Sequence, residues 1–537
     1  MRLYKTTSLF FGLLTLAFSS FSQGSKPPVN WQNLDFKTDG VPGMSTEKAY
    51  KELLANRTGK PVVVAVIDGG VDVQHEDLKD KIWTNSKEVA GDSLDNDGNG
   101  YVDDMYGWNF IGNANGENVQ YDNLEMVRQI RDMQPKYVSV LPSTPLSENE
   151  RRDFLAYQKM NTDYMNKLHV AQLTERAINV FKTNLDSIIH AIGKDSLTIR
   201  DFKAYKPKNK MEGKTLSFLM KSLKEDPDFP KYYRELEEGV EHYEAELNYH
   251  LNMEYDSRPI VGDDYENSLE HHYGNADVEG PDALHGTHVA GIIAANRQNN
   301  LGVKGVADQV KIMVIRVVPD GDERDKDVAN GIFYAVNNGA KVINMSFGKA
   351  YVKDKQIVDS AVRYAMKHDV LLVHAAGNEG EDNDSTPNYP NRNYVDSLGI
   401  NSGVAAAWIE VGASSWKYDA SLVTDFSNYG KKSVDVFAPG LDIHSTVPDS
   451  KYREEQGTSM AAPMVSGLAA LIWSYYPQFK STEIKKIIMN SVFKPTQKVK
   501  IKRGNTNQKV LMDDISVSGG IVNAYEAIKL AEKMTKK

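Results

Sequence analysis

The chain has 537 residues, of which 41% are hydrophobic and 25% charged, a composition typical of a globular protein with about two or three domains. Its formal net charge is −10 and it has no long basic run, which argues against nucleic acid as the main partner. The chain contains no cysteine, so disulfides, thiolate metal sites and a cysteine nucleophile are excluded.

Residues 1–22 have the pattern of an export signal. Arg2 and Lys5 precede a short apolar centre over residues 9–18 and a small-residue cleavage site. This centre is shorter than the roughly 20 residues that a membrane span needs, and no later segment is long and apolar enough, so we expect no transmembrane anchor. The sequence predicts a secreted or periplasmic protein whose mature chain begins at Gln23, with an N-terminal extension over residues 23–60.

A continuous apolar, β-branched run over residues 61–67 predicts a buried parallel strand. It ends in Asp68-Gly69-Gly70. An acid at the carboxyl end of a central strand lies where open α/β sheets place their sites. The alternative is a structural turn, which aspartate often forms at strand ends. Asp68 is therefore a candidate site residue.

Residues 95–104 read Asp-Asn-Asp-Gly-Asn-Gly-Tyr-Val-Asp-Asp. Oxygen-bearing side chains at alternate positions, with a glycine that permits a sharp bend, resemble a calcium loop. The candidate ligands are Asp95, Asp97, Asn99 and Asp103. The glutamate that closes an EF-hand loop is missing, because Tyr106 stands there. A solvated acidic turn is the alternative, but crowded carboxylates repel one another without a cation, which favours a structural calcium ion.

Residues 120–260 are rich in Lys, Glu, Asp, Asn and Tyr and poor in glycine. Ser147–Glu150 has the pattern of a capping box, and apolar residues recur at helical spacing from Tyr157 to Ile192. Further helices are expected over residues 214–223 and 232–253. We interpret residues 120–260 as an inserted all-helical subdomain with a small core of its own and solvated charged faces.

The segment His285-Gly286-Thr287-His288-Val289-Ala290-Gly291 opens a helix of small residues. His285 and His288 share a helical face, so a metal pair is conceivable, but no third ligand has suitable spacing. A general base at the helix start is the favoured interpretation, because histidine exchanges a proton near neutral pH.

Strands and helices then alternate, which predicts an α/β fold with a mostly parallel sheet and helices on both faces. The strand expected over residues 370–375 is followed by Ala376-Gly377-Asn378. The neutral amide of Asn378 suits an oxyanion, although a simple Gly-Asn turn is the alternative. The other expected elements are strands over residues 311–318 and 341–345 and helices over residues 326–338 and 355–368.

The stretch Gly457-Thr458-Ser459-Met460-Ala461-Ala462-Pro463 reads as a turn that opens a buried helix. A serine at such a helix start projects its hydroxyl from the turn, and the helix N-terminus favours a nearby negative charge. The alternative is that Ser459 only caps the helix.

These motifs occur in the chain order Asp, His, Ser, and together they resemble the subtilisin-like serine proteases. The resemblance covers roughly residues 60–110 and 265–535. It implies a peptidase domain over residues 61–119 and 261–537, which residues 120–260 interrupt as a large helical insertion between the Asp and His motifs. It implies that Asp68 orients the base, His285 is the general base and Ser459 the nucleophile, and that His288 is not catalytic. It also implies peptide-bond hydrolysis through an acyl-enzyme.

By the same resemblance, Asn378 is the oxyanion-hole amide. Ser346, Phe347 and Gly348 pair with the peptide backbone, and Ala376 and Gly377 line the primary pocket. Lys349 stands where the family often has glycine, which suggests a larger, charged group that narrows or biases the cleft. The extension over residues 23–60 is too short for the usual folding-assisting propeptide.

The resemblance implies an exported endopeptidase that acts on polypeptides. One alternative is a catalytically silent relative that binds peptides, but such relatives usually lack a triad member. Another is an esterase or acyltransferase, which the missing Gly-x-Ser-x-Gly elbow disfavours. The natural substrate and the oligomeric state do not follow from the sequence.

Overall fold

The computed structural model describes residues 26–536, except 142, 398 and 505. The export signal predicted over residues 1–22 lies outside this range. The described chain divides into two compact units, one made by Met126–Tyr255 and the other by Pro27–Glu125 together with Asp256 onwards. We describe each unit by itself.

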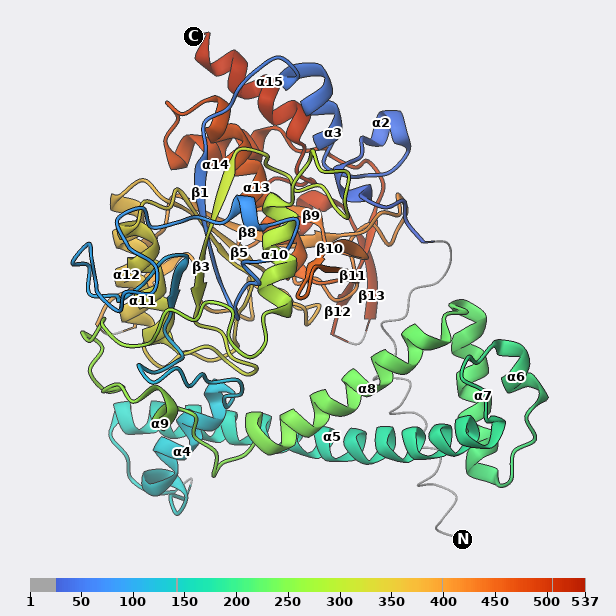
Figure 1. Cartoon of the computed structure of the whole chain (residues 1–537). Helices are drawn as coiled ribbons and strands as arrows, with labels where there is room; N and C mark the ends of the chain where they lie inside the picture. The colour runs from blue at the N-terminus through green and yellow to red at the C-terminus, as the bar shows by residue number, and fades with distance from the viewer. Residues whose placement is uncertain (1–25, 142, 398, 505, 537) are drawn as a thin grey trace. The chain divides into compact units, whose positions relative to one another are not determined.

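The larger unit is built on a seven-stranded sheet in the order β2-β3-β1-β4-β5-β8-β9. Figure 1 labels β1, β3, β5, β8 and β9 of this sheet. All neighbouring strands are parallel. In this order the strands are β2 (Gly107–Asn109), β3 (Val310–Arg316), β1 (Val62–Asp68), β4 (Val342–Met345), β5 (Leu371–Ala375), β8 (Trp408–Ser414) and β9 (Val436–Pro439).

Two apolar cores cover the two faces of this sheet. Side chains alternate along a strand, so Val64 and Val66 of β1 enter one core and Ala65 and Ile67 enter the other. The first core also takes in α10 (Leu284–Ala294), α13 (Thr458–Tyr475), α14 (Ser481–Asn490) and α15 (Ala524–Thr535). The second takes in α11 (Asp325–Asn337) and α12 (Lys355–Lys367). The predicted α/β fold with helices on both faces of a parallel sheet is confirmed.

The remaining elements of the larger unit are short. Three two-stranded antiparallel pairs lie outside the main sheet: β6 (Asn393–Val395) with β7 (Asn401–Val404), β10 (Ile443–Val447) with β11 (Lys451–Glu455), and β12 (Val499–Arg503) with β13 (Thr506–Val510). The short helical turns are η1 (Trp31–Asn33), α2 (Phe36–Asp39), α3 (Thr46–Ala49), η2 (Tyr50–Leu54), η3 (Lys79–Lys81), α9 (Arg258–Val261) and η5 (Met512–Asp514).

The described residues of the smaller unit form helices and no strand. Its elements are α4, which begins in the larger unit (Glu125–Tyr137), α5 (Glu148–Ile192), α6 (Ile199–Ala204), α7 (Lys210–Glu225), α8 (Phe229–Ala245) and η4 (Glu246–His250). The capping box predicted at Ser147–Glu150 is present at the start of α5. Buried side chains of α5, α6, α7 and α8 form a separate core, including Phe181, Phe202, Leu219 and Leu236. The unit therefore stabilises its own fold.

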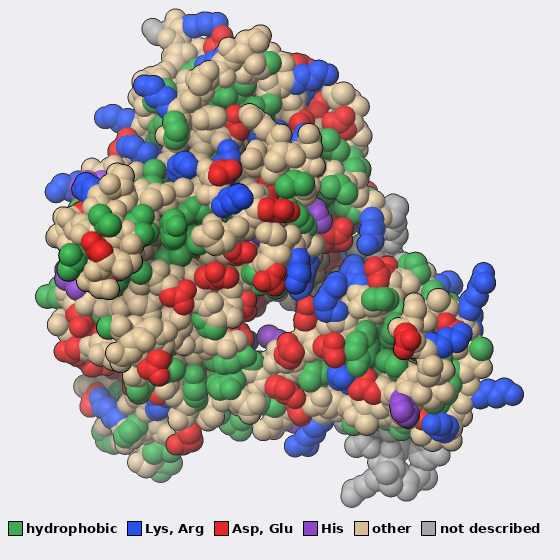
Figure 2. Space-filling view, viewed as in Figure 1, with side chains coloured by type: hydrophobic (Ala, Val, Ile, Leu, Met, Phe, Trp, Pro, Cys, Tyr) green, Lys and Arg blue, Asp and Glu red, His purple; other side chains and the backbone are tan. Residues whose placement is uncertain are grey.

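Lys and Arg side chains are interspersed with Asp and Glu side chains on the face shown in Figure 2. Such a mixed pattern is typical of a solvated surface. None of the helices within the described residues is both long enough and apolar enough to span a bilayer.

Candidate active site

The carboxylate of Asp68 and the imidazole of His285 are hydrogen-bonded. Asp68 ends β1, His285 is the second residue of α10, and Nδ1 of His285 lies 2.7 Å from Oδ1 of Asp68. The Gly69 amide donates to the same carboxylate oxygen at 2.8 Å. A Cβ on Gly286 would lie 2.1 Å from the Gly70 carbonyl oxygen, so only glycine after the histidine lets α10 approach β1 this closely.

The environment of His285 favours its protonated form. Burial works against the charged imidazole, but the adjacent Asp68 carboxylate outweighs this, so the pKa of His285 is raised above its ordinary value near 6.5. Asp68 itself is buried, whereas the side chain of His285 is 44% exposed. A buried acid therefore holds a solvent-accessible imidazole, which is the arrangement that a general base requires.

Ser459 lies at the start of α13, after Gly457, whose φ of 147° suits only glycine. Among the described residues, its hydroxyl bonds only to the Ser346 carbonyl oxygen, to which it donates at 3.0 Å. The Ser346 hydroxyl in turn donates to the Ser459 carbonyl oxygen at 2.9 Å. The Ser459 hydroxyl is thus not bonded to His285 in this conformation.

Asn378 follows β5 and faces the turn that carries Ser459. Its Oδ1 accepts from the Thr458 amide at 2.9 Å and from the Thr458 hydroxyl at 3.0 Å. These two bonds fix the orientation of the side-chain amide and direct Nδ2 away from Thr458. Within the described residues Nδ2 has no hydrogen-bond partner, so both of its protons are available to an oxyanion.

The segment Ser346–Gly348 continues from β4 and offers main-chain groups. Gly348 is exposed, and neither its N–H nor its C=O is hydrogen-bonded within the described residues. The Asn388 amide packs against it, since a Cβ on Gly348 would lie 2.6 Å from Asn388 Nδ2. An extended peptide that pairs with such free groups would add a strand beside this segment.

Ala376 and Gly377 are held by asparagine side chains that the sequence analysis missed. The Ala376 carbonyl accepts from the amides of Asn383, Asn388 and Asn428 at 2.7, 3.2 and 3.1 Å. The Gly377 amide donates to the Thr458 hydroxyl at 3.1 Å. These contacts join residues up to 81 positions apart, and no local pattern marks them.

The sequence suggested that Lys349 narrows or biases the cleft, but the structure buries its side chain instead. Its side chain is 1% exposed, and its ammonium lies 2.8 Å from Asp325 Oδ1 and 3.4 Å from Glu125 Oε2. It also donates to the Glu323 carbonyl oxygen at 2.7 Å. A buried ammonium needs such partners, because an unpaired buried charge is costly.

His288 is a structural residue. Burial lowers its pKa to about 3, so the ring is neutral over the physiological range. Its Nε2 lies 3.0 Å from the Ile443 carbonyl and 3.2 Å from the Arg453 carbonyl. His285 instead contacts Asp68, so the two histidines do not form the metal pair that the sequence left open.

The acidic loop brings two of the predicted ligands, Asp95 and Asp97, together with Glu88, which was not predicted. Carboxylate oxygens of Asp95, Asp97 and Glu88 lie within 4.8 Å of one another, and they form the only such group among the described residues. Glu88 is buried, and its Oε2 has no hydrogen-bond partner. Asp103 turns away to accept from the amides of Gly91 and Ser93.

Asn99 also has internal partners, since its Oδ1 accepts from the Tyr101 amide at 2.8 Å and its Nδ2 donates to Asp104 at 2.9 Å. Its role in this conformation is to shape the loop. The sequence could not identify Glu88, because it lies seven residues before Asp95 and outside the motif.

Comparison with known proteins identifies the family. The subtilase family matches residues 59–512. The chain is 41% identical over 195 residues to the major intracellular serine protease of Bacillus subtilis, covering 36% of this chain and 55% of that protein. It is 36% identical over 208 residues to subtilisin BL of Lederbergia lenta, covering 38% and 69%. It is 35% identical over 246 residues to thermitase of Thermoactinomyces vulgaris, covering 46% and 75%. The matched region thus spans just over half of the first relative. With most of its length matched by one family, the chain belongs to the subtilases.

Proposed function

We propose that this chain is an exported serine endopeptidase with the triad Asp68, His285 and Ser459. The observation that carries the proposal is the 2.7 Å bond between the Asp68 carboxylate and His285 Nδ1, because it leaves Nε2 as the base for a serine. Membership of a family whose relatives are named serine proteases supports it.

In the proposed reaction, His285 Nε2 accepts the proton of the Ser459 hydroxyl while the Ser459 oxygen attacks the peptide carbonyl carbon. The Asn378 Nδ2 protons and the Ser459 amide then stabilise the negative oxygen. The C–N bond breaks, the amine leaves with the proton from His285, and an acyl-enzyme remains. Water, deprotonated by His285, hydrolyses this ester and restores the serine.

The substrate is a polypeptide that pairs with the main chain of Ser346–Gly348. The free N–H and C=O of Gly348 support this placement. Ala376 and Gly377 would form a wall of the primary pocket, and the asparagine amides that bond to the Ala376 carbonyl would keep that wall rigid.

The test uses a serine-directed fluorophosphonate on the full-length protein and on Ser459→Ala, followed by mapping of the labelled residue. We expect one label, on Ser459, and cleavage of a peptide library by the wild type only. Labelling without peptide cleavage but with ester turnover would identify an esterase. A protein that binds peptides but is not labelled would be a silent relative.

We also propose that Glu88, Asp95 and Asp97 hold a structural calcium ion. The buried, unpartnered Oε2 of Glu88 beside two more carboxylates supports this, since hard oxygen donors suit calcium. When bound, the ion would neutralise the loop and stabilise the fold. Asn99 and Asp103, the other predicted ligands, would maintain the shape of the loop.

Thermal unfolding with calcium or a chelator tests this site, with terbium luminescence as a direct readout. Calcium at 100 times its Kd should stabilise the protein by about 2.7 kcal/mol. Glu88→Gln should abolish both the stabilisation and the luminescence. The matched control is Asp92→Asn in the same loop, which should retain both. Equal responses of the two variants would contradict the assignment.

A further inference from the structure

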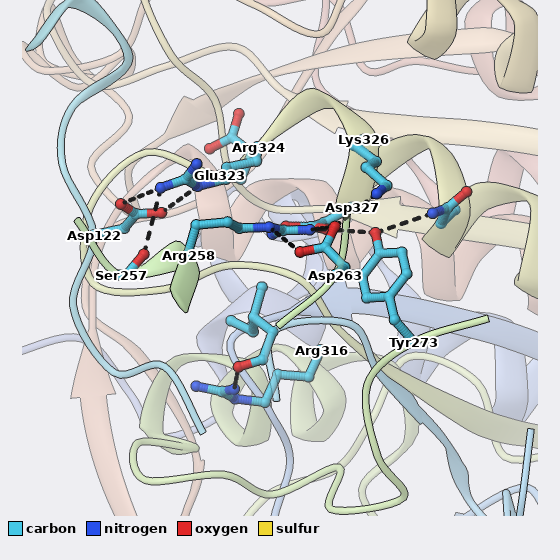
Figure 3. Close-up of polar contacts among 12 residues, drawn as sticks. Asp122, Ser257, Arg258, Asp263, Tyr273, Arg316, Glu323, Arg324, Lys326 and Asp327 are labelled. Atoms are coloured by element: carbon cyan, nitrogen blue, oxygen red, sulfur yellow. Dashed lines mark hydrogen bonds and ion pairs between the residues drawn. The ribbon is translucent and has the colours of Figure 1, made fainter. Parts of the chain in front are cut away.

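A charged hexapeptide, Asp322-Glu323-Arg324-Asp325-Lys326-Asp327, precedes and enters α11. Its basic side chains, Arg324 and Lys326, bond to acidic residues outside the hexapeptide, and its Asp325 and Asp327 carboxylates bond to basic ones. Arg324 Nε donates to Asp122 Oδ2 at 2.7 Å, and Arg324 Nη2 lies 3.1 Å from Asp122 Oδ1 (Figure 3). Arg324 Nη2 also lies 3.1 Å from Asp256 Oδ1. One guanidinium therefore joins the segment that leads into the helical insertion to the segment that returns from it.

The second half of the hexapeptide forms ion pairs with the segment that returns from the insertion. Asp327 pairs with both terminal nitrogens of Arg258, at 2.7 and 3.0 Å. Lys326 donates to Asp263 at 2.6 Å and to Glu270 at 2.9 Å. Figure 3 shows Arg258, Asp263, Lys326 and Asp327 grouped together. Buried, bidentate pairs of this kind fix geometry more firmly than exposed ones.

Lys349 contacts the other side of the same hexapeptide. Its ammonium bonds to the Glu323 carbonyl and the Asp325 carboxylate, and it pairs with Glu125, the last residue of the larger unit before the insertion. Asp325 Oδ2 also accepts from the amides of Lys353 and Asp354 at 3.0 and 2.8 Å. Lys349 thus lies between the start of the insertion and the segment Ser346–Gly348.

The distance from the reactive serine gives this contact a specific consequence. Ser346 bonds to Ser459, and an extended chain advances about 3.3 Å per residue, so Lys349 lies about 10 Å further along the segment. A bound peptide would reach Lys349 only if it had at least about three residues on one side of the scissile bond.

We propose that Lys349 is a positioning residue that fixes the outer end of the substrate-pairing segment through Glu125 and Asp325, and so couples the binding of long peptides to the base of the insertion. The inference rests on the proposed peptidase function. It concerns the extended part of the substrate, whereas the triad acts at the scissile bond.

The experiment compares the wild type, Lys349→Met, Lys349→Arg and Glu125→Gln in the full chain. The matched control is Lys355→Met, which removes another largely buried lysine, paired with Asp359 at 2.7 Å on α12. Fluorogenic peptides are lengthened one residue at a time on either side of the scissile bond. For each, KM and kcat are measured, together with the rate of fluorophosphonate labelling.

We expect Lys349→Met to raise KM about tenfold for the longest peptides and less than about twofold for the shortest, because small misplacements of a binding element are costly. Glu125→Gln should also raise KM for the longest peptides. Lys349→Arg, which keeps the charge, should have a KM for them close to that of the wild type. Labelling should persist in every variant. A uniform change across all peptide lengths, or the same length profile in Lys355→Met, would overturn the proposal.

Hydrogen exchange provides a readout that does not need catalysis. The Lys349 amide donates to the Tyr389 carbonyl at 2.9 Å, and the Tyr389 amide donates back at 3.0 Å. Both amides should exchange faster in Lys349→Met and Glu125→Gln than in the wild type. If Lys349→Met does not fold, Glu125→Gln decides, and unchanged exchange there refutes the inference. A wild type that is neither labelled nor active would refute the proposed function instead.

Discussion

The contact between Asp68 and His285 gives a quantitative prediction for Asp68→Asn. Unit charges 2.7 Å apart interact by about 6 kcal/mol at an effective dielectric constant of 20. Because the His285 side chain is 44% exposed, we take half of this, about 3 kcal/mol, as the charge stabilisation lost when the imidazolium forms. At 1.36 kcal/mol per decade, kcat falls about 10²-fold from this effect alone. Loss of the correct tautomer extends the fall towards about 10⁴-fold.

The pH profile of the same variant tests the sign of the effect. His285 must be neutral to act as a base, and Asp68 raises its pKa, so wild-type kcat/KM should fall as the pH drops through a value above 6.5. In Asp68→Asn burial still lowers the pKa of His285 and only the weaker attraction of Glu455 and Asp282 opposes it, so this limb should move to lower pH. The matched control is Asp282→Asn, three residues before His285, which removes an exposed carboxylate that raises the pKa of His285 less than Asp68 does and should therefore move the limb less. The reasoning would be refuted if kcat of Asp68→Asn fell by less than tenfold, or if the acid limb of its pH profile lay at the same pH as in the wild type.

Three more predictions follow from the structure. Asn378→Ala should lower kcat about 10²- to 10³-fold with little change in KM, as steady-state kinetics would show, because it removes an oxyanion donor. His288→Gln should weaken the pH dependence of the free energy of unfolding, measured by urea unfolding at a series of pH values. In the wild type the unfolded ring protonates below pH 6.5 and the folded ring only near pH 3, so the free energy of unfolding should fall by about 1.4 kcal/mol per pH unit as the pH drops from 6.5 to 3. Replacing residues 126–255 with a short Gly-Ser linker should leave Ser459 labelling by fluorophosphonate intact, because both cores of the sheet lie in the other unit; an unfolded or unlabelled product would indicate a folding or gating role for the insertion.

The fold was predictable because its signals are local and periodic. The apolar run that ends at Asp68 indicated a buried strand, and its alternate side chains enter two different cores. Helical spacing from Tyr157 to Ile192 indicated what is one continuous helix, α5. The strand order in the sheet was not predictable in the same way, since it depends on which distant segments pair.

The details of the candidate site depend on contacts between distant residues. Lys349 was expected in the cleft, but its partner Glu125 lies 224 positions away. Glu88 carries no motif, yet it supplies the unpartnered oxygen of the acidic loop. The asparagine amides at the Ala376 carbonyl likewise have no periodic signature. Asparagine, lysine and glutamate are common on surfaces, so only their burial reveals a specific role.

The 217-residue gap between Asp68 and His285 does not conflict with their close contact. The insertion has its own core, and Arg324 bonds to both Asp122 and Asp256, so the chain leaves and re-enters the larger unit at nearly one point. The entropic cost of closing a loop grows only with the logarithm of its length. A folded insertion with adjoining ends imposes a smaller entropic cost than a flexible loop of the same length. The geometry of Asp68 and His285 is therefore set by β1, by α10 and by Gly286, which lets the two elements approach closely, whatever the length of the chain inserted elsewhere. Asp122, Glu125 and Asp256, which lie in the larger unit next to the two ends of the insertion, are held by Arg324 of the charged hexapeptide and by Lys349.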